Sequence, residues 1–171
     1  ACNGNPTFPF VSNTSGNPWG NVQDLPSGNS ISNPSTNPSS SNSGCLLSGE
    51  SSGGATWVQI NVAAAGTLEF VINQFGYTDW AMWPYNATAC ADIIGNTLPP
   101  VACNWNASSS GGTGIGPVPA GGNPNNFEPT MNVTAGQSFI ICVTNFSNVN
   151  ATVNMTFGGT ANLTCVPFSA S

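Results

Sequence analysis

The stretch Ala151-Thr152-Val153-Asn154-Met155-Thr156-Phe157 alternates strictly between apolar and polar side chains. In a β-strand, successive side chains point to opposite faces of the sheet. Val153, Met155 and Phe157 would therefore face a core, while the residues between them would face solvent. One dry face and one wet face are typical of antiparallel sheets. This stretch predicts an all-β fold.

The neighbouring segments extend the prediction. Thr67–Gln74 repeats the alternation, because its apolar residues at 68, 70 and 72 share one face. Gln137–Phe146 contains the uninterrupted apolar run Phe139–Val143, which indicates a strand buried on both faces. Turn-rich stretches separate these segments, and no helical period is visible. Several short strands at this spacing predict a β-sandwich of two antiparallel sheets. The other strand candidates are Thr56–Val62, Asp79–Tyr85 and Thr130–Thr134.

Residues 1–44 differ from the rest in composition. Residues 12–44 are mostly Ser, Asn, Gly, Pro and Thr, which is typical of a linker or long loop. Ahead of them lies an apolar segment with Phe8, Phe10 and Val11, whose Pro9 suits an edge strand. We therefore expect an extended N-terminal arm and linker over residues 1–44, and one β-sandwich domain over residues 45–171.

The 171 residues include no Lys, Arg or His, against six acids. Without cations the chain cannot neutralise nucleic-acid phosphates or bind anionic lipid through a basic patch. It also has no imidazole base, no Schiff-base lysine and no histidine ligand for a metal. We expect no nucleic acid, no cofactor and no metal among its ligands. Carboxylates are the only acid or base candidates, namely Asp24, Glu50, Glu69, Asp79, Asp92 and Glu128.

Six cysteines without an activating cation predict three disulfides rather than reactive thiols or a zinc site. Disulfides indicate an extracellular location, and a chain that begins Ala1-Cys2 predicts that a signal segment has been removed. Because no apolar run approaches the roughly 18 residues of a membrane span, we expect no membrane insertion. Cys90 and Cys103 are the local pair we favour, and the sequence leaves the other pairings open. The six are Cys2, Cys45, Cys90, Cys103, Cys142 and Cys165.

Eight Asn-X-Ser/Thr triplets, with X not Pro, stand out against roughly four expected by chance from this composition. Asn150 and Asn154 fall on the polar face of the alternating strand, where a bulky glycan has room. We expect N-linked glycans at several of these sites. The alternative is that Asn and Thr merely solubilise the strand faces of a chain almost without charges. The candidate sites are Asn13, Asn86, Asn106, Asn132, Asn145, Asn150, Asn154 and Asn162.

Catalysis has little support in the sequence. A glycosidase needs two carboxylates about 5–10 Å apart across a sugar cleft, and the six acids are scattered along the chain. We predict a protein that is not an enzyme. Asp79 with loop carbonyls is an alternative calcium site, although no spaced acidic loop supports it. The five tryptophans suit either a core or a sugar-stacking surface, namely Trp19, Trp57, Trp80, Trp83 and Trp105.

Over most of residues 45–165 the sequence resembles a β-sandwich module of Bacteroidota cell-surface proteins. The resemblance rests on Gly66-Thr67-Leu68-Glu69-Phe70, on Asp79-Trp80-Ala81-Met82-Trp83, and on Thr134-Ala135-Gly136-Gln137 before the buried strand. Such modules occur in large adhesins exported by the type IX route, often beside gliding-motility-associated domains. The layout is also similar to bacterial pre-peptidase C-terminal domains. The resemblance implies a jelly-roll-like, non-catalytic fold at the cell surface.

These features together predict a self-assembling structural subunit of an extracellular, glycosylated filament. The arm with Phe8, Phe10 and Val11 would add a strand to the sheet edge of another copy, so the partner is the chain itself. Head-to-tail contacts of this kind propagate into open fibres. Alternatively, the arm pairs with its own domain. The chain would then be a monomeric carbohydrate-binding or adhesive module.

Overall fold

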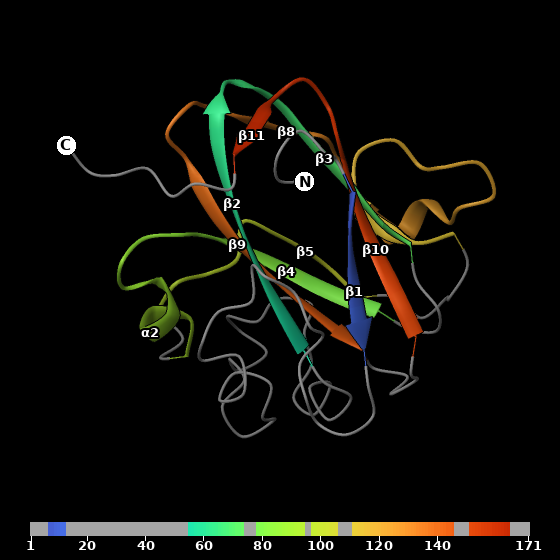
Figure 1. Cartoon of the computed structure of the whole chain (residues 1–171), viewed down its shortest axis with the longest axis horizontal. Coiled ribbons are helices and arrows are strands. Elements are labelled where there is room, and N and C mark those ends of the chain that lie inside the picture. The colour runs from blue at the N-terminus through green and yellow to red at the C-terminus, as the bar shows by residue number, and fades with distance from the viewer. Residues whose placement is uncertain are drawn as a thin grey trace.

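A computed structural model describes residues 7–12, 55–73, 78–94, 97–105, 111–145 and 151–164. Within these residues, almost all regular structure is β-strand, arranged in two sheets (Figure 1). The all-β prediction is confirmed.

The first sheet has the strand order β1-β10-β3-β6-β7, and β8 also pairs with β3. All of its pairings are antiparallel except the short parallel pair of β6 and β7. A 3₁₀ helix, η4 (Pro124–Asn126), leads into β7. The strands are β1 (Thr7–Ser12), β3 (Gly66–Asn73), β6 (Thr113–Ile115), β7 (Phe127–Glu128), β8 (Met131–Val133) and β10 (Ala151–Gly158).

The second sheet is fully antiparallel, in the order β11-β2-β9-β4-β5. One short helix, α2 (Ala89–Ile94), lies between β4 and β5 in the sequence. The sequence does not predict this helix, because its six residues span less than two turns, too few to show a helical period. The strands are β2 (Ala55–Ala64), β4 (Thr78–Pro84), β5 (Ala102–Asn104), β9 (Ser138–Asn145) and β11 (Asn162–Thr164).

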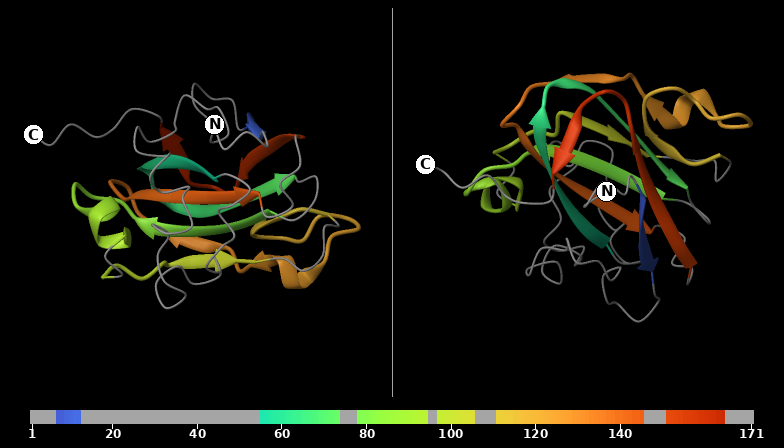
Figure 2. Two further views of the ribbon diagram at one scale, coloured as in Figure 1. Left: turned by 90° about the horizontal axis from the view of Figure 1, so that it is seen from below. Right: turned by 45° about the horizontal axis from the view of Figure 1, so that its top comes forward.

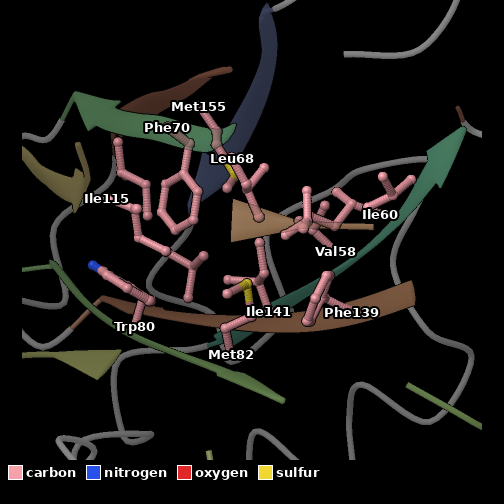
Figure 3. Close-up of a cluster of buried hydrophobic side chains, with 14 residues drawn as sticks. Val58, Ile60, Leu68, Phe70, Trp80, Met82, Ile115, Phe139, Ile141 and Met155 are labelled. Carbon is pink, nitrogen blue, oxygen red and sulfur yellow. The ribbon is translucent and has the colours of Figure 1, made fainter. Parts of the chain in front are cut away.

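The two sheets share one hydrophobic cluster, here called the shared core (Figure 3). Leu68, Phe70 and Ile72 of β3 are each at most 1% exposed, as their predicted common face requires. The ring of Phe70 meets that of Trp80 edge to face, with centroids 4.9 Å apart. This contact joins the sheets, because β3 belongs to the first and β4 to the second. The shared core comprises Val58, Ile60, Val62, Leu68, Phe70, Ile72, Trp80, Met82, Ile115, Val133, Phe139, Ile141, Val143 and Met155.

The opposite face of β4 and β9 is also buried. There Ala81, Trp83, Ile140 and Cys142 form a second cluster with Ile93 of α2, here called the outer cluster. Residues Tyr85, Leu98 and Cys103 pack against it. The segment containing α2 therefore packs against the second sheet, and α2 lies beside one end of its strands (Figure 2). This accounts for the uninterrupted apolar run in β9.

One glycine is fixed by the close approach of two strands. A Cβ atom at Gly114 of β6 would overlap the carbonyl oxygen of Phe70 on β3, next to Val71, its register partner. Only a residue without a side chain lets β6 reach β3 here. With three residues and a glycine at its centre, β6 shows no strand pattern in the sequence.

Candidate functional site

The apolar segment near the N-terminus forms β1 and occupies the end of the first sheet. It pairs antiparallel with β10 over six residues, from Thr7 opposite Thr156 to Ser12 opposite Ala151. β10 in turn pairs with β3 on its other side. Strand β1 is separated from β2 by residues 13–54, yet it completes this sheet beside a strand near the other end of the sequence (Figure 1). If β1 were removed, β10 would become an edge strand with unpaired backbone groups.

The register places the three arm residues named above against particular residues of β10. Phe8 is opposite Met155 and Phe10 is opposite Val153, while Val11 is opposite Thr152. Met155 is completely buried and belongs to the shared core. Strand β1 therefore lies directly beside the shared core.

The carboxylates in the described residues make separate contacts. Glu69 Oε1 accepts a hydrogen bond from the Thr130 hydroxyl at 2.8 Å. Glu128 Oε1 accepts one from Asn104 Nδ2 at 2.9 Å. Each is held by a different neutral partner. Asp24 and Glu50 lie outside the described residues.

Asp79 and Asp92 are the other two acids in the described residues. Asp79 is 3% exposed on β4, in register with Thr144 of β9. Asp92 is on α2, and its Oδ2 accepts a hydrogen bond from the Thr88 hydroxyl at 2.7 Å. Among the described residues, no group of three or more His, Cys, Asp or Glu side chains is placed to hold a metal ion.

A shallow hollow of about 260 Å³ lies at β10, β3 and β6 of the first sheet. Its lining is mainly apolar and includes Phe70, Ile115 and Phe157. Glu69 is its one acidic residue. The lining of this hollow therefore lacks the second carboxylate that a paired-carboxylate reaction needs.

A polar network that sequence analysis missed joins the two sheets at the end formed by β5 and β7. Asn104 Nδ2 of β5 donates to Glu128 Oε1 and also to the Asn125 carbonyl at 3.1 Å. Nearby, Trp80 Nε1 donates to the Thr113 hydroxyl at 2.9 Å, and this hydroxyl donates to the Asn126 carbonyl at 2.7 Å. None of these asparagines belongs to a recognisable motif, so only their positions in the fold reveal the network.

The candidate glycosylation sites fall into three groups. Asn86, Asn132 and Asn162 are solvent-exposed. Asn145 and Asn154 lie on strands β9 and β10, where the backbone alone is described. The remaining candidates, Asn13, Asn106 and Asn150, lie outside the described residues. Accessibility to a glycosylating enzyme can therefore be compared among the three exposed sites, Asn86, Asn132 and Asn162.

One cysteine belongs to the outer cluster and another packs against it. Cys103 is disulfide-bonded, and Cys142 is buried within the cluster. Cys90 is on α2. Cys2, Cys45 and Cys165 lie outside the described residues.

The tryptophans separate into core and surface residues. Trp80 and Trp83 are fully buried, so neither belongs to a sugar-stacking surface. Trp105 is 53% exposed, directly after β5. Trp57 is on β2, where only its backbone is described, and Trp19 lies outside the described residues.

Comparisons with known proteins add no assignment. No protein-family model matches the sequence, and no curated protein or solved structure is significantly similar to it. In the part of the chain that the structure describes, no helix is both long enough and apolar enough to span a membrane.

Proposed function

We propose that this chain is a non-enzymatic structural subunit of an extracellular, glycosylated surface filament. In this filament, residues Thr7–Ser12 of one copy add to the β10 edge of the next. The observation that carries the proposal is the β1–β10 pairing, because it defines both a donor strand and the edge that accepts it. The resemblance to Bacteroidota surface modules agrees with this location.

Strand exchange would make the same pairing between two chains instead of within one. Its backbone hydrogen bonds and its register are identical in either case, so exchange between copies costs little beyond chain entropy. Residues 13–54 connect β1 to β2. The 42 residues from 13 to 54 have a maximal extended length of roughly 140 Å. That reach is sufficient for a neighbouring sheet edge.

Within this proposal the two sheets form a jelly-roll-like β-sandwich that is linked by disulfides. Its support is the shared core, to which both sheets contribute. Cys90 is the partner we infer for Cys103, because α2 and β5 both border the outer cluster. A disulfide there would fasten the covering segment to the sheet. Peptide mapping without reduction tests the pair.

The polymer test uses two single variants, Thr7→Cys and Thr156→Cys, at positions that are opposite each other in the register. Cross-strand neighbours lie within disulfide distance. When the two variants are mixed and oxidised, a covalent mixed dimer is expected. A double variant that closes its disulfide only within one chain, with no mixed dimer from the singles, would refute the exchange.

Electron microscopy of native material provides the second test. We expect uniform fibres that are lost when residues 1–12 are deleted or when Phe10 is replaced by Asp, because a charge opposite Val153 disfavours the pairing. Thr7→Asp is the matched control, since its register partner Thr156 is only half-buried. Monodisperse monomers at high concentration would contradict the proposal.

The non-enzymatic part is supported by the separate neutral partners of Glu69 and Glu128. Its test is a panel of glycan substrates. Turnover that disappears in Asp79→Asn or Glu69→Gln would overturn it.

A second candidate function is a carbohydrate-binding or adhesive module. The specific observation in its favour is Trp105, whose indole is 53% exposed and free to stack on a sugar ring. Glycan-array binding that is lost in Trp105→Ala, from a protein that stays monomeric, would favour this function over the filament.

A further inference from the structure

The triplet Asn86-Ala87-Thr88 lies in a turn immediately after strand pairing ends. The backbone N–H of Tyr85 still donates to the Ser138 carbonyl at 2.8 Å, in continuation of the β4–β9 ladder. The three residues that follow are all exposed. Ala89, the first residue of α2, is buried and ends the exposed stretch.

Hydrogen bonds fix the orientation of the Asn86 carboxamide. Its Oδ1 accepts from the backbone N–H of Thr88 at 2.9 Å and lies 3.1 Å from the Thr88 hydroxyl. A backbone N–H can only donate, so the oxygen must face Thr88 and the nitrogen must face away. This is an Asx-turn. Asn86 Nδ2, the atom that carries an N-linked glycan, therefore points away from the turn in an exposed residue.

Asp92 holds the third residue of the triplet. The Thr88 hydroxyl lies 2.7 Å from Asp92 Oδ2, one helical turn further along. The N–H of Asp92 donates to the Thr88 carbonyl at 3.0 Å. The threonine that an N-glycosylation triplet requires is thus held in place by α2.

The other two exposed candidates are built into strands. Asn132 pairs with Thr67 in the β8–β3 ladder, and its neighbour Val133 is 3% exposed within the shared core. Asn162, on β11, is opposite Ala64 of β2, and its neighbour Leu163 packs against the same core. A transferase cannot take either triplet into its cleft without opening a strand and exposing a core residue.

We propose that Asn86 is the glycan acceptor that the folded chain presents, in preference to Asn132 and Asn162. The co-reactant is a sugar activated as a diphosphate ester. The Nδ2–C1 bond forms as the bond between C1 and the diphosphate oxygen breaks. The diphosphate leaves with the bonding electrons, and a base of the transferase takes one Nδ2 proton.

This inference rests on the proposed glycosylated subunit and refines it. A glycan at Asn86 would project from the end of β4, in the second sheet. The strand-exchange edge formed by β1 and β10 belongs to the first sheet. Modification at this turn is therefore compatible with assembly through β1.

The test is glycopeptide mass spectrometry of native protein. A protease that cleaves after aromatic residues replaces trypsin, because the chain has no Lys or Arg. We expect high occupancy at Asn86 and several-fold lower occupancy at Asn132 and Asn162. Equal occupancy at all three, or none at Asn86, would overturn the inference. If native fibres carry no glycan at Asn86, the Asn86 inference fails while the filament proposal stands.

Variants separate the acceptor role from folding. In the native host, Thr88→Ser retains a hydroxyl and is expected to keep Asn86 occupied, whereas Thr88→Ala is expected to abolish occupancy. Thr134→Ala is the matched control at the Asn132 triplet and should leave Asn86 unchanged. Circular dichroism verifies that each variant is folded. Persistent occupancy in folded Thr88→Ala would contradict the assignment.

Discussion

The shared core and the outer cluster are both fully buried, but they are closed in different ways. The shared core lies between two sheets, whose long strands contribute from both sides. The outer cluster lies between one sheet and a short covering segment, to which α2 contributes Ile93. A core between two rigid layers cannot collapse around a cavity, whereas a short cover can adjust. Equal burial therefore does not mean equal contribution to stability.

Truncation in the shared core should give the largest effect. Trp80→Ala removes a fully buried ring, its edge-to-face contact with Phe70 and its hydrogen bond to Thr113. We expect it to lower the free energy of unfolding by about 3–5 kcal/mol. Urea unfolding followed by far-ultraviolet circular dichroism measures this. A loss below about 1 kcal/mol would show that the two sheets do not depend on this core.

Truncation in the outer cluster should cost less. Ile93→Ala removes a side chain that is 1% exposed, but α2 can settle toward β4. We expect a loss of about 2 kcal/mol, the lower end of the range for such substitutions. The same unfolding experiment applies, with disulfides intact. A loss equal to that of Trp80→Ala would break the comparison, because it would mean that the cover is as rigid as a sheet.

Variants in the polar network between β5 and β7 test what holds the two sheets together at the border of the shared core. Asn104→Ala deprives the Asn125 carbonyl and Glu128 of a donor at a position that is 7% exposed. We expect a loss of about 1–2 kcal/mol. Glu128→Gln keeps an amide oxygen as acceptor for Asn104 and is expected to cost less. The reverse order would show that the charge, rather than the donor, holds the two sheets at this border.

Surface truncation should give the smallest effect. Trp105→Ala removes an indole that is 53% exposed, and the change in unfolding free energy is expected to stay within about 0.5 kcal/mol. A much larger loss would indicate that Trp105 packs against residues outside the described part of the chain. This variant is also the baseline for Trp80→Ala.

Local patterns predicted the longer strands. Leu68, Phe70 and Ile72 share a buried face as their spacing requires, and the run Phe139–Val143 is buried on both faces. The three-residue strand β8 was predicted as Thr130–Thr134. The other short strands β5, β6, β7 and β11 were not predicted, because a period of two needs more residues to become visible. Helix α2 was missed for the same reason.

The candidate site shows a similar division. The triplet at Asn86 is visible in the sequence, but its Asx-turn and its support by Asp92 are not. The sequence favours Asn150 and Asn154 by their place on an alternating strand, and it does not distinguish Asn86 from Asn132 or Asn162. Strand pairing at Asn132 and Asn162 distinguishes them, because it ties their neighbours to the core.

By itself, the sequence determined the all-β class and the absence of cationic chemistry, because alternation and composition are properties of the chain alone. Only the tertiary structure decided which strand completes the edge at β10, which tryptophans are buried and which asparagine is presented in an exposed turn. Those outcomes depend on pairing between residues far apart in the chain, such as Thr7 and Thr156. Such pairing leaves no local signal, since its energy comes from contacts made only after the sheets assemble.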